Sequence, residues 1–222
     1  MSTTGVDPYL AWVGFYDEWS ATMEGDVAFY VRRATAVPGP VIELGVGTGR
    51  IAIPIAEADM RSFVAEAPVN LVTIPYRSFL HMITTEDQLT CLRNVGRSLV
   101  SGGHLILNMF VPDPAFIAGQ DRKRNLHTEF TDERGRRCEV WVTPVYDMTT
   151  QIVTIRATVD AYDGDRLAAS TESEMVVRMI YRFEMEHLLA RTGFEVEELY
   201  GDFDESPLVG GSSEMIWVAR KP

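Results

Sequence analysis

Residues 41–49 combine a carboxylate and three glycines in a spacing that suits ligand binding. The run Val-Ile-Glu-Leu-Gly-Val-Gly-Thr-Gly begins as an apolar segment, carries Glu43 near its end and then has a glycine at every second position. Glycine lets the backbone take a positive φ and, because it has no Cβ, allows another group to approach closely. The helical pattern 51–58 follows directly. The glycines therefore stand where a strand would pass into a helix N-terminus, and such a junction favours a nucleotide-like ligand.

A second set of reactive side chains lies in segment 75–81, Pro-Tyr-Arg-Ser-Phe-Leu-His. It follows a predicted strand, and open α/β sheets bind their ligands beyond the carboxyl ends of the strands. His81 is the best candidate for a general base, although a histidine at a helix start can also be satisfied by the backbone. Tyr76 and Arg77 could orient an acceptor, and Arg77 could equally be a surface partner of Glu86.

The composition limits the classes of partner. The chain has 222 residues and a net charge of −12, which argues against nucleic acid and anionic membranes, because phosphate contacts need a basic face. No apolar run approaches the ~18 residues of a membrane span. Cys91 and Cys138 lie far apart, without metal-ligand spacing, so we expect neither a disulfide framework nor a metal site. These features predict a cytoplasmic protein that acts on a small molecule.

Strand and helix patterns alternate along much of the chain. This alternation predicts an α/β fold with a doubly wound, mostly parallel, Rossmann-like sheet. The expected elements are strands at 41–44, 69–75 and 104–110, a helix at 49–58, a helix that is capped by Thr84 and ends near Val100 before Ser101-Gly-Gly103, a helix at 183–192, and strands at 194–200 and 214–220.

Changes of pattern divide the chain into three predicted parts. Residues 1–40 carry aromatic side chains at helical spacing and are interpreted as an N-terminal helical cap. Residues 41–111 and 182–222 form the core. Residues 112–181 contain three or four strand-like runs separated by hairpin-turn residues. We interpret them as an antiparallel insertion that serves as a lid or as the surface of a homodimer.

From Glu43 through Gly49 the chain has the form E/D-x-G-x-G-x-G and resembles the class I S-adenosylmethionine-dependent methyltransferases. The resemblance continues in order: 59–63 resembles the adenine-side segment, 71–82 the fourth strand with its catalytic-face loop, and 99–108 the glycine turn into the fifth strand. The cap and the late insertion are similar to those of small-molecule methyltransferases, including aminosugar N,N-dimethyltransferases. The resemblance implies S-adenosylmethionine as the cofactor and methyl transfer to N or O of a small-molecule acceptor. The glycine spacing disfavours an NAD dehydrogenase.

The resemblance also implies roles for single residues. Gly45 and Gly47 would pack under the methionine part of the cofactor, which Glu43 would help to hold. Asp59 would accept a hydrogen bond from the adenine amino group, with Met60 against the ring. The other cofactor-binding positions are Gly49, Arg50, Pro75 and Tyr16. Of these, Tyr16 would close over the methionine end. Tyr16 could instead be a packing residue of an aromatic helix face, and Glu43 a polar strand end.

Only ten positions separate Gly49 from Asp59. In the family a second strand ending in the acid that binds the ribose, a further helix and a third strand occupy this interval. These elements need on the order of 30–40 residues. Either they are deleted, so that the sheet lacks its second and third strands, or Arg61–Glu66 forms a makeshift second strand with Glu66 as the ribose acid. We favour the deletion. It raises an alternative to the enzyme function: a catalytically impaired relative of the methyltransferases that acts through association.

Overall fold

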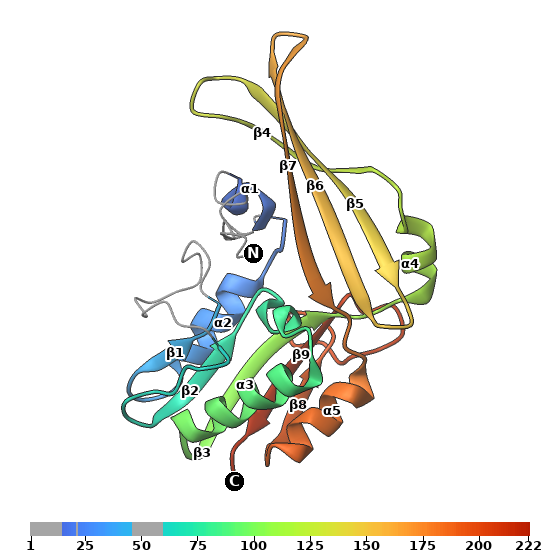
Figure 1. Cartoon of the computed structure of the whole chain (residues 1–222). Helices are drawn as coiled ribbons and strands as arrows, with labels where there is room; N and C mark the ends of the chain where they lie inside the picture. The colour runs from blue at the N-terminus through green and yellow to red at the C-terminus, as the bar shows by residue number, and fades with distance from the viewer. Residues whose placement is uncertain (1–14, 21, 46–59) are drawn as a thin grey trace, which may run out of the picture. The chain divides into compact units, whose positions relative to one another are not determined.

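The computed structural model describes residues 15–20, 22–45 and 60–222, which form two compact units (Figure 1). One unit joins the residues up to Thr22 to 113–179, and the other joins 23–112 to 180–222. The N-terminal forty residues contribute to both units, because helix α1 (Tyr16–Ser20) belongs to the first and helix α2 (Asp26–Thr35) to the second. The division into cap, core and insertion stays a prediction.

The second unit is built on sheet A, whose strands lie in the order β1-β2-β3-β9-β8. Strands β1, β2 and β3 are parallel, and β9 is antiparallel to both of its neighbours, so β8 runs in the same direction as β3. The predicted α/β class with a mostly parallel sheet is confirmed. The strand bounds are β1 Val41–Glu43, β2 Val69–Ile74, β3 Leu99–Phe110, β8 Glu195–Tyr200 and β9 Glu214–Arg220.

Within the described ranges, sheet A ends at β1, which pairs with β2 alone. The alternative in which Arg61–Glu66 forms a second strand is wrong, because this segment is a turn followed by irregular backbone and contains no strand. Two hydrogen bonds tie it to the following helix: Asn94 Nδ2 donates to the carbonyl of Arg61 at 2.8 Å, and the Ala65 N–H donates to Ser98 Oγ at 2.9 Å. Glu66 is exposed. The helix predicted at 49–58 lies outside the described residues.

Helix α3 (Thr85–Ser98) begins as predicted and ends earlier than predicted. Its N-cap is Thr84, whose hydroxyl accepts a hydrogen bond from the Asp87 N–H at 3.1 Å. The sequence placed this end near Val100, whereas Leu99 already has extended backbone angles (φ −93°, ψ 145°) and pairs with Val69 as the first residue of β3.

Apolar side chains cover both faces of sheet A. Phe29 and Tyr30 of α2 are buried against strand residues of one face, Leu71, Ile106, Ile216 and Val218. Helices α3 and α5 (Arg182–Arg191) pack together and lie on the other face (Figure 1). Both faces of the sheet are thus covered, and the candidate site lies at the carboxyl ends of its parallel strands.

The first unit is built on sheet B, an antiparallel sheet of four strands in the order β4-β5-β6-β7. The predicted three or four antiparallel strands are thus confirmed as four. One face of the sheet is apolar and packs against Phe15, which directly precedes α1, and against Trp19 within α1. The bounds are β4 Asn125–Thr131, β5 Arg137–Asp147, β6 Ile152–Asp163 and β7 Arg166–Arg178, with helix α4 at Pro114–Gln120 ahead of them.

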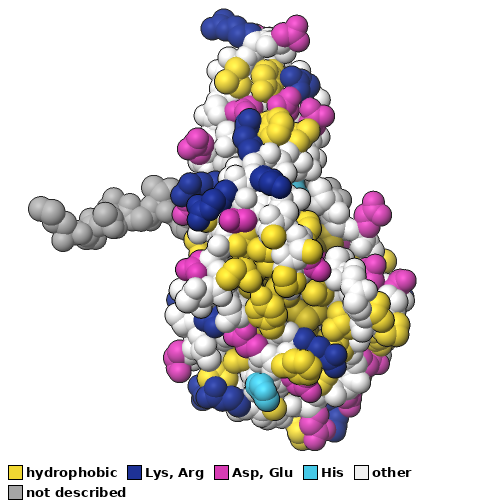
Figure 2. All heavy atoms as spheres, turned by 90° about the vertical axis from the view of Figure 1, so that its right-hand side faces the viewer, with side chains coloured by type: hydrophobic (Ala, Val, Ile, Leu, Met, Phe, Trp, Pro, Cys, Tyr) yellow, Lys and Arg dark blue, Asp and Glu magenta, His cyan; other side chains and the backbone are white. Residues whose placement is uncertain are grey.

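Charged side chains of both signs share the surface. On the face drawn in Figure 2, acidic and basic side chains are interspersed, although the chain as a whole carries a net charge of −12. None of the helices that the structure describes is long and apolar enough to cross a membrane.

Candidate functional site

The carboxyl end of β1 carries the first of the predicted site residues. Glu43 is the last residue of β1 and is buried, with 6% of its surface exposed. The Leu44 N–H donates to the carbonyl of Thr73 at 2.8 Å, so the contact with β2 extends one residue beyond the strand. Gly45 follows in the left-handed region, at φ +76°. The chain therefore turns directly after the buried carboxylate.

Gly45 is required by a contact within the chain. A Cβ at this position would lie 2.6 Å from Ser78 Cβ and 2.7 Å from Ser78 Oγ, closer than real Cβ atoms approach other atoms. The Ser78 hydroxyl donates to the carbonyl of Pro75 at 2.8 Å and lies 3.3 Å from the carbonyl oxygen of Gly45. The sequence suggested that the missing Cβ makes room for a ligand. In the structure Ser78 occupies that space, so the turn at Gly45 rests on segment 75–81.

Segment 75–81 has an unusual backbone. Tyr76 (φ 51°) and Arg77 (φ 61°, ψ 15°) are consecutive residues in the left-handed region. Such a conformation costs on the order of 1–3 kcal/mol for each residue that has a side chain. The 3-10 helix η2 (Ser78–His81) follows immediately. Contacts elsewhere must hold these two residues in place, and Arg77 makes them.

A chain of polar contacts runs from Arg77 across sheet A. The Arg77 guanidinium donates to Glu214 Oε1, with Nε at 3.0 Å and Nη2 as a second donor, and it lies over the Phe110 ring. The other carboxylate oxygen of Glu214 accepts from Asn108 Nδ2 at 2.9 Å. Asn108 Oδ1 accepts from the Tyr30 hydroxyl at 2.9 Å. The Glu214 carboxylate thus has a cation and an amide donor although it is almost fully buried.

Tyr30 lies among three buried carboxylates. Burial is the main cause that raises the pKa of Tyr30 well above its ordinary value, and the charges of Glu214, Asp26 and Glu43 raise it further. The phenol therefore remains protonated and can donate to Asn108.

The remaining predicted site residues fall into three groups. Pro75 is buried, and Met60 and His81 are half-buried, all in the second unit. Tyr16 belongs to α1 in the first unit, and the structure does not describe its side chain. Four predicted positions lie outside the described residues: Gly47, Gly49, Arg50 and Asp59. The cofactor and catalytic roles of all these residues stay predictions.

Sequence reasoning missed the partner of Arg77. The suggested pairing with Glu86 is wrong, because Arg77 is engaged by Glu214, and Glu86 lies 3.7 Å from Arg93, about two helical turns further along α3. One signal was present: Asn108 and Glu214 are polar residues inside or beside apolar strand runs. A polar side chain at such a position needs a buried partner, although the sequence does not say which one.

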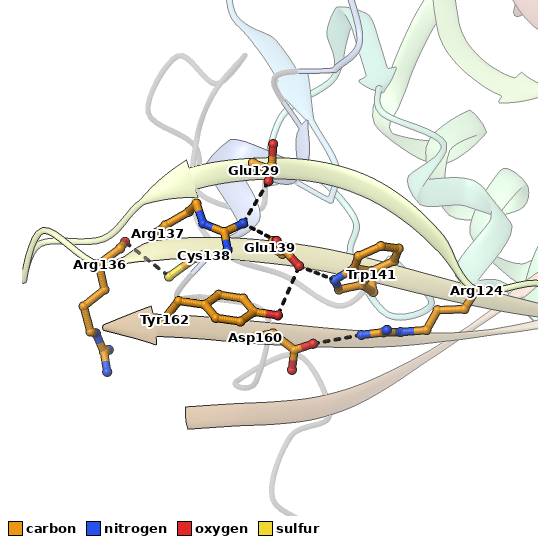
Figure 3. Close-up of polar contacts among 9 residues, drawn as sticks. All are labelled: Arg124, Glu129, Arg136, Arg137, Cys138, Glu139, Trp141, Asp160 and Tyr162. Carbon is orange, nitrogen blue, oxygen red and sulfur yellow. Dashed lines mark hydrogen bonds and ion pairs between the residues drawn. The ribbon is translucent and has the colours of Figure 1, made fainter. Parts of the chain in front are cut away.

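A second polar cluster lies on the face of sheet B opposite its apolar core (Figure 3). Glu139 accepts from Trp141 Nε1 at 2.9 Å and from the Tyr162 hydroxyl at 3.3 Å, and it also pairs with Arg137. The hydrogen bond from Trp141 is the largest cause that lowers the pKa of Glu139, followed by the bond from Arg137. None of the predicted site residues lies in this cluster.

Comparison with known proteins extends this description. No protein-family model matches the chain, and no curated protein matches it in sequence. Solved structures do match. The first is an S-adenosylmethionine-dependent methyltransferase from Clostridium acetobutylicum ATCC 824, with a TM-score of 0.76 and 11% identity, covering 96% of this chain and 99% of that one.

Two further matches are methyltransferases from Streptomyces and Micromonospora. The CcbJ methyltransferase from Streptomyces caelestis has a TM-score of 0.75 and 18% identity over 97% of this chain and 99% of its own. CalS10 from Micromonospora echinaspora, an amino pentose methyltransferase of calicheamicin biosynthesis, has a TM-score of 0.67 and 17% identity over the whole of both chains. The chain therefore has the fold of the S-adenosylmethionine-dependent methyltransferases.

Proposed function

We propose that the chain binds S-adenosylmethionine at the carboxyl edge of sheet A and transfers its methyl group to a nitrogen or oxygen of a small molecule. The observation that carries this proposal is the end of β1, where the buried Glu43 is followed by the left-handed turn at Gly45. This is the position at which an open α/β sheet binds a nucleotide-like ligand. The likeness in fold to methyltransferases supports the same assignment.

The buried carboxylate at the end of β1 suits this ligand. The donor sulfur of S-adenosylmethionine is positively charged, and Glu43 lies two residues before the turn at Gly45. Methyl transfer from a sulfonium is an in-line displacement that depends mainly on alignment and exclusion of water. In this proposal Glu43 and the turn at Gly45 hold the methionine end, and His81 receives the proton that a hydroxyl or ammonium acceptor loses.

Calorimetric titration with S-adenosylmethionine and with its demethylated product tests the proposal directly. We expect both to bind, each with a dissociation constant below about 1 mM. No detectable heat at millimolar ligand would remove the enzyme assignment. Because CalS10 is described as an amino pentose methyltransferase, amino sugars are the first acceptor class to assay for methyl transfer once binding is established.

A matched pair of glycine variants localises the site. Gly45→Ala introduces a Cβ that overlaps Ser78, whereas Gly164→Ala adds one at a similar φ of +62° with nothing within 4 Å. We expect Gly45→Ala to weaken binding of the demethylated product at least tenfold and Gly164→Ala to leave it unchanged. The double variant Gly45→Ala/Ser78→Gly removes the overlap and should recover part of the affinity. Equal affinity in all three variants would contradict a site at this turn.

One observation favours the second candidate, a catalytically impaired relative. Within the described residues sheet A ends at β1, and the segment 60–66 supplies no strand and only the exposed Glu66. Loss of two charge-assisted hydrogen bonds to the ribose removes about 3–6 kcal/mol, which is a hundredfold in affinity or more. The 2′-deoxy analogue of the demethylated product separates the readings. It should bind as well as the parent if no carboxylate holds the ribose, and far more weakly if one does.

A further inference from the structure

The turn at Gly45 is linked to a residue near the end of the chain through a continuous series of contacts. Gly45 rests on Ser78, and Ser78 is adjacent to Arg77, whose guanidinium is held by Glu214 at the start of β9. Glu214 is in turn held by Asn108 of β3. The series therefore crosses sheet A from its edge strand to β9.

We propose that Arg77 and Glu214 are a positioning pair that fixes segment 75–81, and through it the turn at Gly45, in the geometry that binds the methyl donor. This inference rests on the proposed function for the identity of the ligand. Neither residue needs to touch the donor or the acceptor. Their role is to hold two backbone segments whose relative position decides whether the site exists.

The geometry explains why this pair has that role. Tyr76 and Arg77 are both in the left-handed region, which side chains other than glycine rarely adopt, so segment 75–81 does not keep its shape through local preference. The Arg77 side chain anchors it at one point, between the Glu214 carboxylate and the Phe110 ring. Phe110 and Glu214 are directly opposite each other in the β3–β9 ladder, so the anchor is part of the rigid sheet.

The carboxylate itself is fixed. Only 6% of the Glu214 side chain is exposed, against 40% for Arg77, and the Asn108 amide that holds its other oxygen is oriented by Tyr30. Each donor and acceptor in this series has a single assigned direction, because the protonated Tyr30 donates and Asn108 must then accept with Oδ1 and donate with Nδ2. The Arg77 fork therefore meets an acceptor whose position does not depend on solvent.

The double variant Arg77→Met/Glu214→Met tests the proposal. Replacing both members of a buried ion pair with apolar side chains often leaves stability unchanged, whereas it removes the directional bonds that fix segment 75–81. We expect a folded protein with a modestly lower melting temperature, because Asn108 Nδ2 loses its acceptor. Its dissociation constant for the demethylated product of S-adenosylmethionine should rise at least tenfold.

Hydrogen exchange provides a readout that needs no ligand. Three amides report on the segment: Ser78, Leu80 and Met82 donate to the carbonyls of Pro75, Arg77 and Phe79 at 2.9–3.1 Å. In the double variant these amides should exchange at least tenfold faster, while those of the β3–β9 ladder keep their protection. Unchanged exchange and unchanged affinity in a folded double variant would overturn the proposal.

A matched control lies at the other end of β9. Arg220 donates to Glu197 at 2.7 Å, in an ion pair of the same residue types that is more exposed and remote from Gly45 in the strand register. Arg220→Met/Glu197→Met should change neither the affinity nor the exchange of the three amides. An equal loss in this control would also contradict a specific role for Arg77 and Glu214.

If the double variant does not fold, Arg77→Lys provides a milder test. It keeps the charge but loses the two parallel N–H donors of the guanidinium, so it should give an intermediate increase in the hydrogen-exchange rates and in the dissociation constant. Parent-like values in Arg77→Lys would then count against the pair. If the parent protein binds neither form of the ligand, the proposed function fails, and the exchange of the three amides still decides whether Arg77 and Glu214 hold the segment.

Discussion

The polar networks of the two sheets differ in depth and in sequence separation. At the carboxyl edge of sheet A, Arg77 reaches Glu214 across 137 residues, and the carboxylate is buried. On the polar face of sheet B, Arg137 reaches Glu139 across two residues, on neighbouring positions of one strand (Figure 3). The first network joins elements that would otherwise be independent. The network on sheet B lies on strands that backbone hydrogen bonds already hold together.

This contrast predicts where a substitution matters. A buried ion that loses its partner remains in a medium that solvates it poorly, whereas an exposed ion is screened by water. Loss of a single polar side chain in the network of sheet A should therefore lower the free energy of unfolding. In the network of sheet B it should mainly change the pKa of neighbouring groups.

Arg77→Ala should give the largest effect. It leaves the Glu214 carboxylate without its cation, and we expect a loss of about 2–4 kcal/mol in the free energy of unfolding, below the 3–5 kcal/mol of a fully buried pair because 40% of the Arg77 side chain is exposed. Urea denaturation measures this value. Arg220→Ala, in an exposed pair, should cost about 0–1 kcal/mol. Equal losses for the two variants would mean that the Glu214 environment is accessible to water.

Tyr30→Phe should give an intermediate effect. Removing the hydroxyl leaves Asn108 Oδ1 without its donor, which costs about 1–2 kcal/mol. The variant should also change the dependence on pH. Because the pKa of Tyr30 is raised in the folded state, its contribution is fully present below the unfolded value of about 10 and is lost as the pH rises above it. Urea denaturation between about pH 9 and 11 should therefore show a shallower decline in Tyr30→Phe than in the parent, and parallel curves would contradict the burial of Tyr30.

The smallest effect concerns Glu139. Its pKa is lowered first by the Trp141 hydrogen bond and then by the hydrogen bond and the charge of Arg137, so Trp141→Phe and Arg137→Met should each raise the pKa of Glu139. A lowered carboxyl pKa contributes stability above the unfolded value that is lost as the pH falls through the folded one. Carboxyl NMR titration measures both shifts. An unchanged pKa in Trp141→Phe would show that the indole N–H does not stabilise this carboxylate.

The sequence predicted local features well. The Thr84 cap, the end of α5 before Gly193 and the bounds of β9 depend on residues close to one another, so short-range patterns are sufficient. The start of β3 was missed because Leu99 leaves the helix to pair with Val69, and that choice is made by the sheet. Local pattern was also sufficient to identify Glu43 as a strand end and Gly45 as a turn. The contacts of Gly45 with Ser78 and of Arg77 with Glu214 join distant parts of the chain, and local pattern could not predict them.

The connectivity of sheet A also bears on how the chain folds. Strand β3 lies between β2 and β9, and 106 residues separate Asn108 from its partner Glu214. During synthesis β3 therefore emerges long before the strand that covers its second edge, while sheet B, whose pairings are between consecutive strands, can form in the interval. We expect β3 to be the element most exposed to misassociation in a nascent or refolding chain. Closure by β9 would then complete both the sheet and the anchor of Arg77 in one late step.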